Sequence, residues 1–282
     1  MKRIFYLLIG LSLTLYQNLY AQVHCLLEDK DLFQEKIELF ENENLPGMPA
    51  HHIAATVGKS FVGVPYVAST LEVGDKEQLV VNFRELDCTT FLENVVVFSL
   101  ILEERKTTFE EFTEQLQKVR YRGGELNGYV SRLHYFSEWI ADNQKKGYLR
   151  NITKELGGVP LEKEINFMGT HRQSYKHLKT NEENYQHILK VEEQLKELSL
   201  YYIPQEDIET IEGKMQAGDL IAITTSIKGL DVSHVGVAYE QQGRIHLMHA
   251  STTGQVVISE EPLADYIKKH KKQTGIIVSR LR

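Results

Sequence analysis

Residues 88–105 read CTTFLENVVVFSLILEER, and this stretch decides the fold. Apolar side chains cover nearly the whole circumference of the helix that it predicts. A helix that is apolar on all sides belongs at the centre of a core rather than at a surface. Asp87 stands where an N-cap residue is expected, so Cys88 falls in the first turn. The sequence therefore predicts a buried central helix with a thiol at its N-terminal end.

Further elements are predicted on both sides of this helix. Apolar residues at helical spacing predict helices over residues 29–41, 50–61, 109–119, 131–144 and 182–198. After Gly218 the pattern changes to short runs with a period of two, which predicts strands over residues 220–225, 234–239, 244–251, 256–259 and 275–281. Helices followed by strands favour an α+β fold, in which an antiparallel sheet of about five strands packs on the central helix.

The first 21 residues have the layout of a secretory signal peptide. Lys2 and Arg3 precede an apolar stretch from Ile4 to Leu15, and the small residue Ala21 precedes Gln22. The apolar stretch is shorter than the ~20 residues of a membrane-spanning helix, so we expect export and cleavage without stable membrane insertion. An uncleaved anchor is the alternative. One domain is predicted over residues 22–282, with a helical insertion at about 107–205.

The composition is that of an ordinary globular protein and argues against a polyanionic partner. The chain has 282 residues, 42% of them hydrophobic, and a formal net charge of −7. Nucleic-acid binding needs a basic face or stripe, and the one short basic run, Lys268 to Lys272, is interpreted as a solvated helix end. No nucleic-acid partner is therefore expected.

The two cysteines, Cys25 and Cys88, leave two readings open. They form a disulfide, or Cys88 is a free thiol kept for chemistry. Cys25 is close enough to the predicted cleavage point to raise the question of lipidation, but His24 is bulkier than lipoprotein processing normally accepts. A thiol at a helix N-terminus is shifted towards the reactive thiolate by the helix dipole, whereas a lone buried cysteine is more often structural.

A second motif favours the catalytic reading of Cys88. In the predicted strand from Ser233 to Tyr239, His234 shares its face only with Gly236 and Ala238, so another element has room to approach. If Tyr239 faces Arg244 across the hairpin loop 240–243, His234 lies directly opposite His249, and His246 lies on the far face. His249 would then fix the tautomer of His234, giving a Cys-His-polar triad. A slip of one residue would exchange His249 for His246.

Short motifs in a fixed order also carry a resemblance. They are Pro65-Tyr66, Asp87-Cys-Thr-Thr-Phe91, Ser233-His-Val-Gly236 and His249-Ala-Ser251. They resemble the motifs of NlpC-type cell-wall hydrolases, which are bacterial papain-like enzymes that cleave peptidoglycan peptides. The longer pattern resembles their N-acetylmuramoyl-L-alanine amidase-like branch; it includes Ser69-Thr-Leu-Glu72, Gly229-Leu-Asp-Val-Ser-His234 and the closing strand from Gly275 to Arg280.

The resemblance implies a papain-like fold and a role for each matching residue. Cys88 would be the nucleophile, His234 the base and His249 the orienting residue, while the Tyr66 hydroxyl would lie beside the oxyanion. No cofactor or metal is implied, and the location would be the bacterial periplasm or the medium. Two features depart from compact members of the superfamily: the long separation of Cys88 from His234 and a longer spacing from His234 to His249.

The extra residues between nucleophile and base are expected to shape the substrate cleft. Flat rings suit sugar faces and guanidinium groups suit carboxylates, although packing is the alternative for each residue. The candidates for substrate binding are Glu72, Arg132, Tyr135, Trp139, His171 and Ser233.

The resemblance implies an amidase that cuts between N-acetylmuramic acid and L-alanine in anhydro-muropeptides. The alternative within the class is an endopeptidase that cuts after D-glutamate; both reactions are acyl transfers. A zinc amidase would use His234, His246 and His249 as ligands, but the chain lacks a His-Glu-x-x-His helix. A non-catalytic muropeptide-binding protein is a further alternative.

Overall fold

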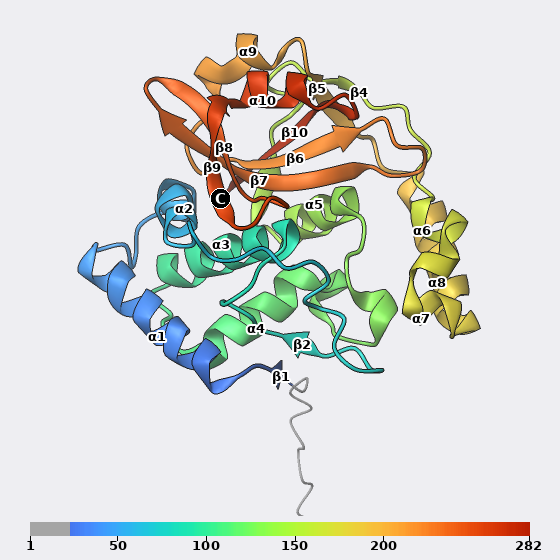
Figure 1. Ribbon diagram of the computed structural model, residues 1–282, viewed down its shortest axis with the longest axis horizontal. Coiled ribbons are helices and arrows are strands. Elements are labelled where there is room, and N and C mark those ends of the chain that lie inside the picture. The colour runs from blue at the N-terminus through green and yellow to red at the C-terminus, as the bar shows by residue number, and fades with distance from the viewer. Residues whose placement is uncertain (1–22) are drawn as a thin grey trace, which may run out of the picture.

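The structure is a computed structural model that describes residues 23–282, so the predicted signal peptide lies outside the described residues. A layer of helices packs on one face of an antiparallel sheet, two short helices cover the other face, and α6, α7 and α8 lie to one side (Figure 1). The helices are α1 (Leu27–Asn42), α2 (Ala50–Lys59), α3 (Cys88–Glu103), α4 (Phe109–Arg120), α5 (Phe136–Lys145), α6 (Phe167–Thr170), α7 (Lys176–Lys179), α8 (Glu182–Leu195), α9 (Ile208–Ile211) and α10 (Leu263–Lys269). Four 3-10 helices are present in the described residues: η1 (Arg122–Gly124), η2 (Tyr129–Ser131), η3 (Arg172–Ser174) and η4 (Glu212–Lys214).

The strands form a two-stranded pair and a larger sheet. They are β1 (Val23–His24), β2 (Leu79–Val80), β3 (Leu149–Asn151), β4 (Val159–Pro160), β5 (Tyr201–Pro204), β6 (Leu220–Thr225), β7 (Val232–Gln241), β8 (Arg244–Ala250), β9 (Val256–Pro262) and β10 (Gln273–Leu281). In the larger sheet the order is β4-β5-β10-β6-β7-β8-β9, and β3 also pairs with β10.

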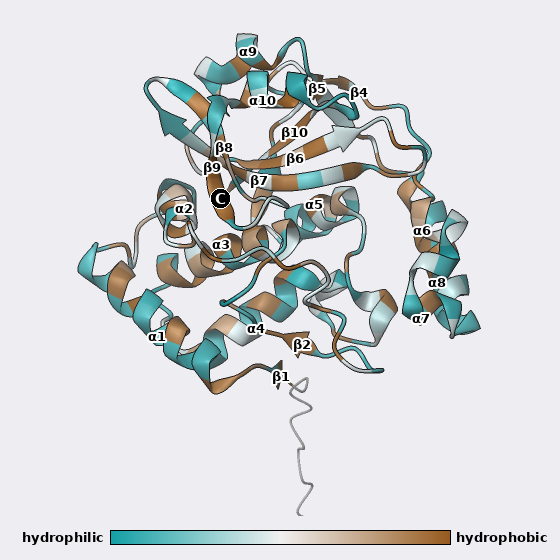
Figure 2. Ribbon diagram, viewed as in Figure 1, coloured by the Kyte–Doolittle hydropathy of each residue, from teal (hydrophilic) through white to brown (hydrophobic). Residues whose placement is uncertain are grey.

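The central helix α3 is confirmed as predicted. Its N-cap is Asp87, whose side chain accepts a hydrogen bond from the Thr90 N–H at 2.8 Å, while the Thr90 hydroxyl oxygen accepts one from the Asp87 N–H at 2.9 Å. This reciprocal pair satisfies two polar groups at the helix start. All residues from Thr90 to Leu102 are buried, and apolar residues colour much of α3 and the central strands brown in Figure 2.

The sheet is larger than predicted. All five predicted strands are present, but the sheet has eight strands in the described part of the chain. The additional strands β3, β4 and β5 have two to four residues each and come from the segment predicted as a helical insertion. Strands this short are stabilised by their neighbours in the sheet rather than by an alternating sequence of their own. The segment 107–205 therefore contains both helices and strands.

One predicted helix begins later than expected. The pattern over residues 131–144 predicted a helix from Ser131, but α5 begins at Phe136. The residues before it have extended backbone at Arg132 and Tyr135. The N–H of Ser137 at the start of α5 donates a hydrogen bond to the buried Asp231 carboxylate at 2.7 Å. This contact fixes the helix start to the segment that leads into β7.

Alternating residues of β7 face two different cores. Val235 and Val237 belong to the core that contains α3, whereas Ala238 belongs to the core on the other face, which contains α10. His234 and Gly236 share the face of Ala238 because strand residues alternate. In the described part of the chain, residues 23–282, no helix is long and apolar enough to cross a membrane.

Candidate active site

Cys88 is the first residue of α3 and lies beside the start of β7. Its side chain hydrogen bonds with the backbone of Val235, the residue that follows His234, and with Thr89. It is a free cysteine that is partly exposed. The structure thus brings the thiol at the start of the central helix next to the histidine strand, as the sequence predicted.

The Cys88 thiol is more basic than its helix position alone predicts. Burial and then the Asp87 charge raise its pKa to about 11, and the hydrogen bonds with Val235 and Thr89 lower it by less. At neutral pH the side chain is therefore a neutral thiol. It needs a base to become a nucleophile, because the thiolate is the reactive form.

The hairpin that carries the histidines has a different register from the predicted one. Gln241 pairs with Arg244, and Tyr239 pairs with His246. The turn is the two-residue pair Gln242 and Gly243, whose φ angles of 53° and 75° are those of a type I′ turn. The prediction placed Tyr239 opposite Arg244, so it was wrong by two residues, because it assumed a longer loop.

The slip of two residues keeps the face of each side chain, so the predicted partner of His234 is unchanged. His234 lies diagonally across from His249 rather than directly opposite, and its Nε2 is 2.6 Å from His249 Nδ1. The two rings are nearly perpendicular, at 89°. Between them Gly236 makes the approach possible, since a Cβ there would lie 3.0 Å from the His249 Cβ.

A β-bulge directly before His234 helps to aim its side chain. Ile223 of β6 pairs with His234, but the next residue, Thr224, pairs with Val232, which leaves Ser233 as an extra residue. Bulges locally increase strand twist and often re-aim side chains next to active sites. Ser233 is exposed and lies beside the two histidines in the same cavity.

Both imidazoles are neutral at pH 7. Burial, and then the nearby His270, lowers the pKa of His234 to about 4. Burial, followed by His234 and His270, lowers the pKa of His249 to about 3. A neutral His234 accepts a proton, and because its Nε2 contacts His249, Nδ1 is the nitrogen that remains for this task.

Tyr66 is held beside the entry to α3. Its N–H donates to the Gly254 carbonyl at 2.7 Å, and the N–H of Val67 donates to the Leu86 carbonyl at 3.2 Å. The pKa of the Tyr66 hydroxyl is raised by burial and then by the Cys88 and Asp87 charges, which are close to it. The hydroxyl therefore stays protonated and able to donate a hydrogen bond near the sulfur.

Glu72 and Arg132 bind each other. Arg132 Nη2 is 2.5 Å from Glu72 Oε1, and Arg132 Nε is 3.4 Å from Glu77 Oε1. The guanidinium is 7% exposed and lies 5.1 Å from the Tyr129 ring centroid. Its charge is thus matched inside the protein, so Arg132 is not free to bind a substrate carboxylate as the sequence reading expected.

Tyr135 and Trp139 lie in the core rather than in a cleft. Tyr135 is 1% exposed, and its hydroxyl donates to Glu192 at 2.7 Å and accepts from the Met168 N–H at 2.8 Å. Trp139 is fully buried and stacks on Phe136. Both were candidates for substrate binding, but neither presents surface to a ligand.

His171 is exposed but lies apart from the triad contacts. It lies at the end of α6, stacked on Phe167 with ring centroids 4.0 Å apart, and its Nδ1 is 2.8 Å from the Phe167 carbonyl oxygen. The N–H of Phe167 in turn donates to the Gly229 carbonyl at 2.9 Å. His171 is therefore connected, through Phe167, to the segment before β7, but it does not line the cavity that contains His234 and His249.

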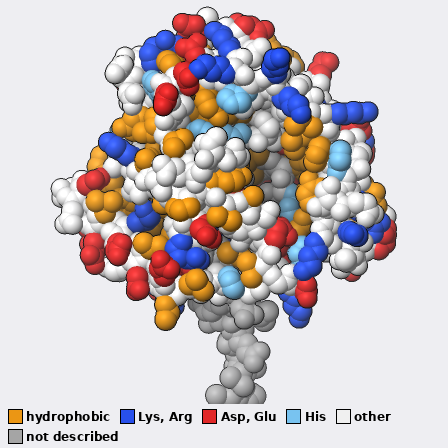
Figure 3. Space-filling model, viewed as in Figure 1, with side chains coloured by type: hydrophobic (Ala, Val, Ile, Leu, Met, Phe, Trp, Pro, Cys, Tyr) orange, Lys and Arg blue, Asp and Glu red, His pale blue; other side chains and the backbone are white. Residues whose placement is uncertain are grey.

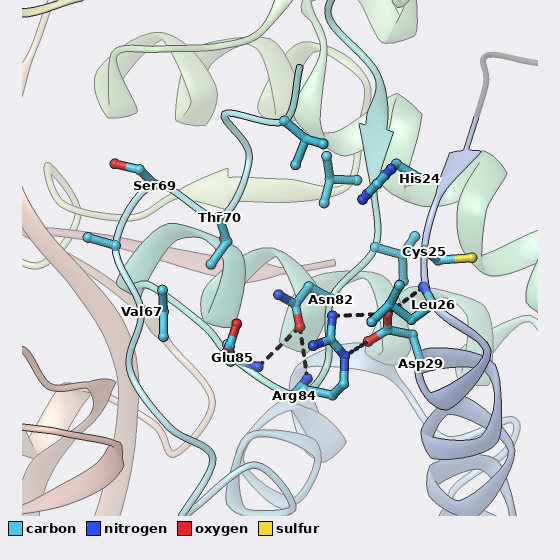
Figure 4. A pocket seen from close by; sticks show the side chains of 14 residues that line it. His24, Cys25, Leu26, Asp29, Val67, Ser69, Thr70, Asn82, Arg84 and Glu85 are labelled. Atoms are coloured by element: carbon cyan, nitrogen blue, oxygen red, sulfur yellow. Dashed lines mark hydrogen bonds and ion pairs between the residues drawn. The ribbon is translucent and has the colours of Figure 1, made fainter.

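The two histidines and Cys25 line different cavities. The cavity that contains His234 and His249 has a volume of ≈ 410 Å³. On the face seen in Figure 3 the molecule is hollowed near its centre, and histidine side chains gather around the hollow. A different cavity of ≈ 310 Å³ borders α1 and β2 and contains Cys25. There the side chains of His24 and Cys25 point in opposite directions, and Asp29 and Arg84, which also line the cavity, form an ion pair (Figure 4).

A zinc site built on the three histidines does not form. His246 lies on the other face of β8 from His249, and its Nδ1 is 2.8 Å from the Ser259 carbonyl oxygen. Among residues 23–282, no three His, Cys, Asp or Glu side chains are grouped so that they could hold a metal ion.

Three residues near the site were missed by the sequence reading. Asp231 is 1% exposed and anchors the segment before His234 to α5. Tyr266 packs edge-on against His249, and His270 packs against Tyr266, with ring centroids 5.3 and 4.6 Å apart. Tyr266 and His270 are four residues apart around α10, but nothing in their sequence spacing indicates that they face β8.

Comparisons with known proteins show the family of the chain. The family model described as AmiA-like, N-acetylmuramoyl-L-alanine amidase-like, matches residues 56–276. A crystal structure of an N-acetylmuramoyl-L-alanine amidase from Bacteroides uniformis is 37% identical, covers 81% of this chain and 98% of that chain, and has a TM-score of 0.78. A Bacteroides fragilis protein put forward as a xylanase is 38% identical, with 80% and 99% coverage and a TM-score of 0.77.

A Legionella pneumophila protein shares the fold at 20% identity, with 90% and 95% coverage and a TM-score of 0.65. No curated protein matches the chain. The match of the family model covers most of the sequence, so the chain belongs to the N-acetylmuramoyl-L-alanine amidase-like family. This membership implies a hydrolase that acts on peptidoglycan.

Proposed function

We propose that this protein is a cysteine amidase that hydrolyses the amide between N-acetylmuramic acid and L-alanine in peptidoglycan fragments such as anhydro-muropeptides. The observation that supports the proposal is a contacting pair of histidines, one of them on the strand that the thiol touches. His234 Nε2 lies 2.6 Å from His249 Nδ1, and Cys88 hydrogen bonds with the adjacent Val235. A thiol, a base and a residue that orients the base are the parts that thiol acyl transfer needs.

The first step is attack on the carbonyl carbon of the muramoyl group. His234 Nδ1 takes the Cys88 proton as the sulfur bonds to this carbon, and the carbonyl oxygen becomes an oxyanion. The Cys88 N–H and the Tyr66 hydroxyl are the proposed donors to it. Loss of such a donor costs about 3 kcal/mol in other hydrolases.

The second step separates the peptide. His234, now protonated, gives its proton to the nitrogen of L-alanine, the carbon–nitrogen bond breaks, and the peptide leaves as an amine. The muramoyl group stays on Cys88 as a thioester. Water, deprotonated by His234, then attacks the thioester and releases the muramic acid carboxyl and the free thiol.

The resting protonation states are those from which this sequence starts, but the pKa values make proton transfer from Cys88 to His234 uphill in the free protein, so the transfer has to accompany formation of the carbon–sulfur bond. Cys88 begins as a thiol and His234 as a neutral base, because burial holds their pKa values at about 11 and about 4. His249 also stays neutral, so its Nδ1 accepts the hydrogen bond from the His234 Nε2–H without repelling the His234 imidazolium formed during the reaction.

Of the other functions, a xylanase fits the site less well and an endopeptidase would use the same residues. A xylanase needs two carboxylates facing each other across the sugar bond, whereas the described residues that line the histidine cavity include no carboxylate. An endopeptidase that cuts after D-glutamate would use the same triad and differs only in which amide is placed at Cys88.

We place the protein outside the bacterial cytoplasm, in the periplasm or the medium, on the strength of its predicted signal peptide.

The test is product analysis by mass spectrometry. Anhydro-muropeptides are incubated with the protein and with its Cys88→Ala variant, each with and without EDTA. The proposal expects free peptide beginning at L-alanine, unaffected by EDTA and absent with Cys88→Ala. Cleavage after D-glutamate would identify an endopeptidase, and turnover by Cys88→Ala would rule out the thiol mechanism.

A further inference from the structure

The cavity that contains His234 and His249 is cationic, although the chain as a whole has a net charge of −7. Besides the two histidines and Ser233, it is lined by His270, Lys271 and Lys272, which follow α10. None of the described residues that line it is an aspartate or a glutamate. A cavity with one sign of charge favours ligands of the opposite sign.

The lysines of this run differ in how their charges are used. Lys268 and Lys269, at the end of α10, form ion pairs with Glu209 and Glu261. Within the described residues, Lys271 and Lys272 form no ion pair and both line the cavity. Lys271 and Lys272 therefore bring two positive charges to the cavity of the two histidines that no acidic side chain of the described residues pairs with, so these charges are available to a ligand.

The direction of the reaction indicates which part of the substrate lies here. His234 must deliver its proton to the leaving nitrogen, so the leaving group extends from the sulfur towards the imidazole side of the site. His234 and His249 form part of the lining of the cavity, so the cavity borders the imidazole that delivers this proton. In the proposed reaction the leaving group is the peptide, which carries the D-glutamate carboxylate and further carboxylates beyond it.

We propose that this cavity is the subsite for the peptide half of the substrate, and that Lys271 and Lys272 bind its carboxylates. The inference rests on the proposed function, because it takes His234 as the proton donor to the leaving amine. The hydroxyl of Ser233 adds a neutral hydrogen-bonding group at the same wall. A neutral or amidated peptide would lack the charge that this subsite recognises.

Binding without turnover tests the subsite. The probe is N-acetyl-L-alanyl-D-glutamate, whose acylated nitrogen mimics the scissile amide, and the control probe is the same dipeptide with both carboxyls amidated. Each is titrated by NMR into the Cys88→Ala protein. The subsite variant adds Lys271→Gln and Lys272→Gln, and the control variant adds Lys268→Gln and Lys269→Gln, which change the charge equally but do not line the cavity.

The inference expects the acidic probe to bind more tightly than the amidated one. It expects roughly tenfold weaker binding in the subsite variant, since each exposed charge pair contributes up to about fivefold, and little change in the control variant. Equal binding of the two probes, equal effects of the two variants, or no binding at all would overturn it. Because the assay needs no hydrolysis, it is separate from the amidase test: turnover with no effect of the lysines would leave the amidase standing and remove the subsite.

Discussion

At the scale of single residues, the site is controlled by burial. The thiol of Cys88 and the imidazoles of His234 and His249 are all held in their neutral forms, because charged forms lose hydration inside the protein. The helix dipole at the start of α3 favours the thiolate, but burial and the Asp87 carboxylate act against it. In the proposed mechanism the chemistry therefore depends on proton transfer from Cys88 to His234 and not on a thiolate that is present beforehand.

Asp87 has two effects that substitution can separate. It caps α3, and its charge raises the pKa of Cys88. Asp87→Asn keeps a good cap but removes the charge, so we expect faster alkylation of Cys88 by iodoacetamide at pH 8 with little loss of stability. Asp87→Ala should also react faster but lose about 1 kcal/mol of unfolding free energy. An unchanged alkylation rate in Asp87→Asn would contradict this assignment.

The buried histidines should make the folded state sensitive to mild acid. Their pKa values are about 4 and about 3 in the fold and near 6.5 when unfolded, so the unfolded chain binds more protons below pH 6.5. Their contribution is complete above pH 6.5 and is lost as the pH falls towards 4. Well below pH 6.5, each imidazole should lower the unfolding free energy by about 1.4 kcal/mol for each unit by which the pH falls. Urea unfolding between pH 7 and pH 5 measures this decline.

The control for this measurement is the double variant His234→Gln with His249→Gln. The unfolding free energy of this variant should fall less steeply between pH 7 and pH 5, whatever its value at pH 7. A decline that is as steep in the variant as in the unchanged protein would assign the acid sensitivity to other groups.

At the scale of elements, the site depends on three local features. They are the start of α3, the β7–β8 hairpin and the bulge at Ser233. The hairpin brings the two histidines to 2.6 Å because Gly236 has no side chain between them. Glycine is needed at this position because it has no Cβ and not because of its backbone conformation, since Gly236 lies inside the strand β7 and has no positive φ.

Gly236→Ala tests this role of the hairpin. The added Cβ would lie 2.6 Å from the Met248 carbonyl oxygen and 3.0 Å from the His249 Cβ, so β8 must shift. We expect a loss of about 1–3 kcal/mol in unfolding free energy and loss of muropeptide hydrolysis. Gly213→Ala is the matched control because no atom lies within 4 Å of its added Cβ. Full activity of Gly236→Ala would show that the contact of the histidines is dispensable.

The sequence predicted which histidines meet but not how the strands pair. A shift of two residues in the strand pairing leaves every side chain on the same face of the sheet. The shared face of His234 and His249 was therefore predictable from strand alternation, although the predicted pairing was wrong. The register depends on the turn, and Gln242 in a left-handed conformation gives no strong signal, since asparagine and glycine are the usual residues there. The bulge at Ser233 depends on tertiary contacts and has no mark in the sequence.

At the scale of the whole molecule, the first part of the segment 107–205 belongs to the core around α3, whereas α6, α7 and α8 pack in a separate cluster. Helices α4 and α5 contribute Phe112 and Trp139 to the core around α3, and β5 pairs with β10. Arg120 of α4 forms a buried ion pair with Glu93 of α3 at 2.7 Å. The site at the start of α3 is thus supported by residues that follow it in the chain.

Tyr135→Phe tests whether that residue is structural. Its hydroxyl joins α5 to Glu192 of α8 and to the Met168 N–H, and all three groups lie inside the protein. Removing it should cost about 1–3 kcal/mol of unfolding free energy, with KM for the muropeptide unchanged. Tyr185→Phe, whose hydroxyl makes a 3.3 Å contact with the Gly169 carbonyl oxygen, should have a smaller effect. A raised KM with an unchanged unfolding free energy would instead indicate that Tyr135 binds the substrate.

This segment differs most from what its sequence predicted. Tyr135, Trp139 and Arg132 combine rings with charge, which is equally typical of a sugar cleft and of a polar core, and only burial distinguishes the two. The short strands β3, β4 and β5 have too few residues for a period to be visible. The long apolar helix α3 and the strands with clear alternation were predictable because their patterns repeat over several turns or residue pairs.

The most direct test of the account is to identify what becomes attached to Cys88 during turnover. The protein is mixed with an anhydro-muropeptide, quenched with acid within the first turnovers, digested and analysed by mass spectrometry. The account predicts that the peptide containing Cys88 carries the muramoyl half of the substrate as a thioester, and that Cys88→Ala carries nothing. A peptide half on Cys88, an adduct on another residue, or continued hydrolysis by Cys88→Ala would contradict it.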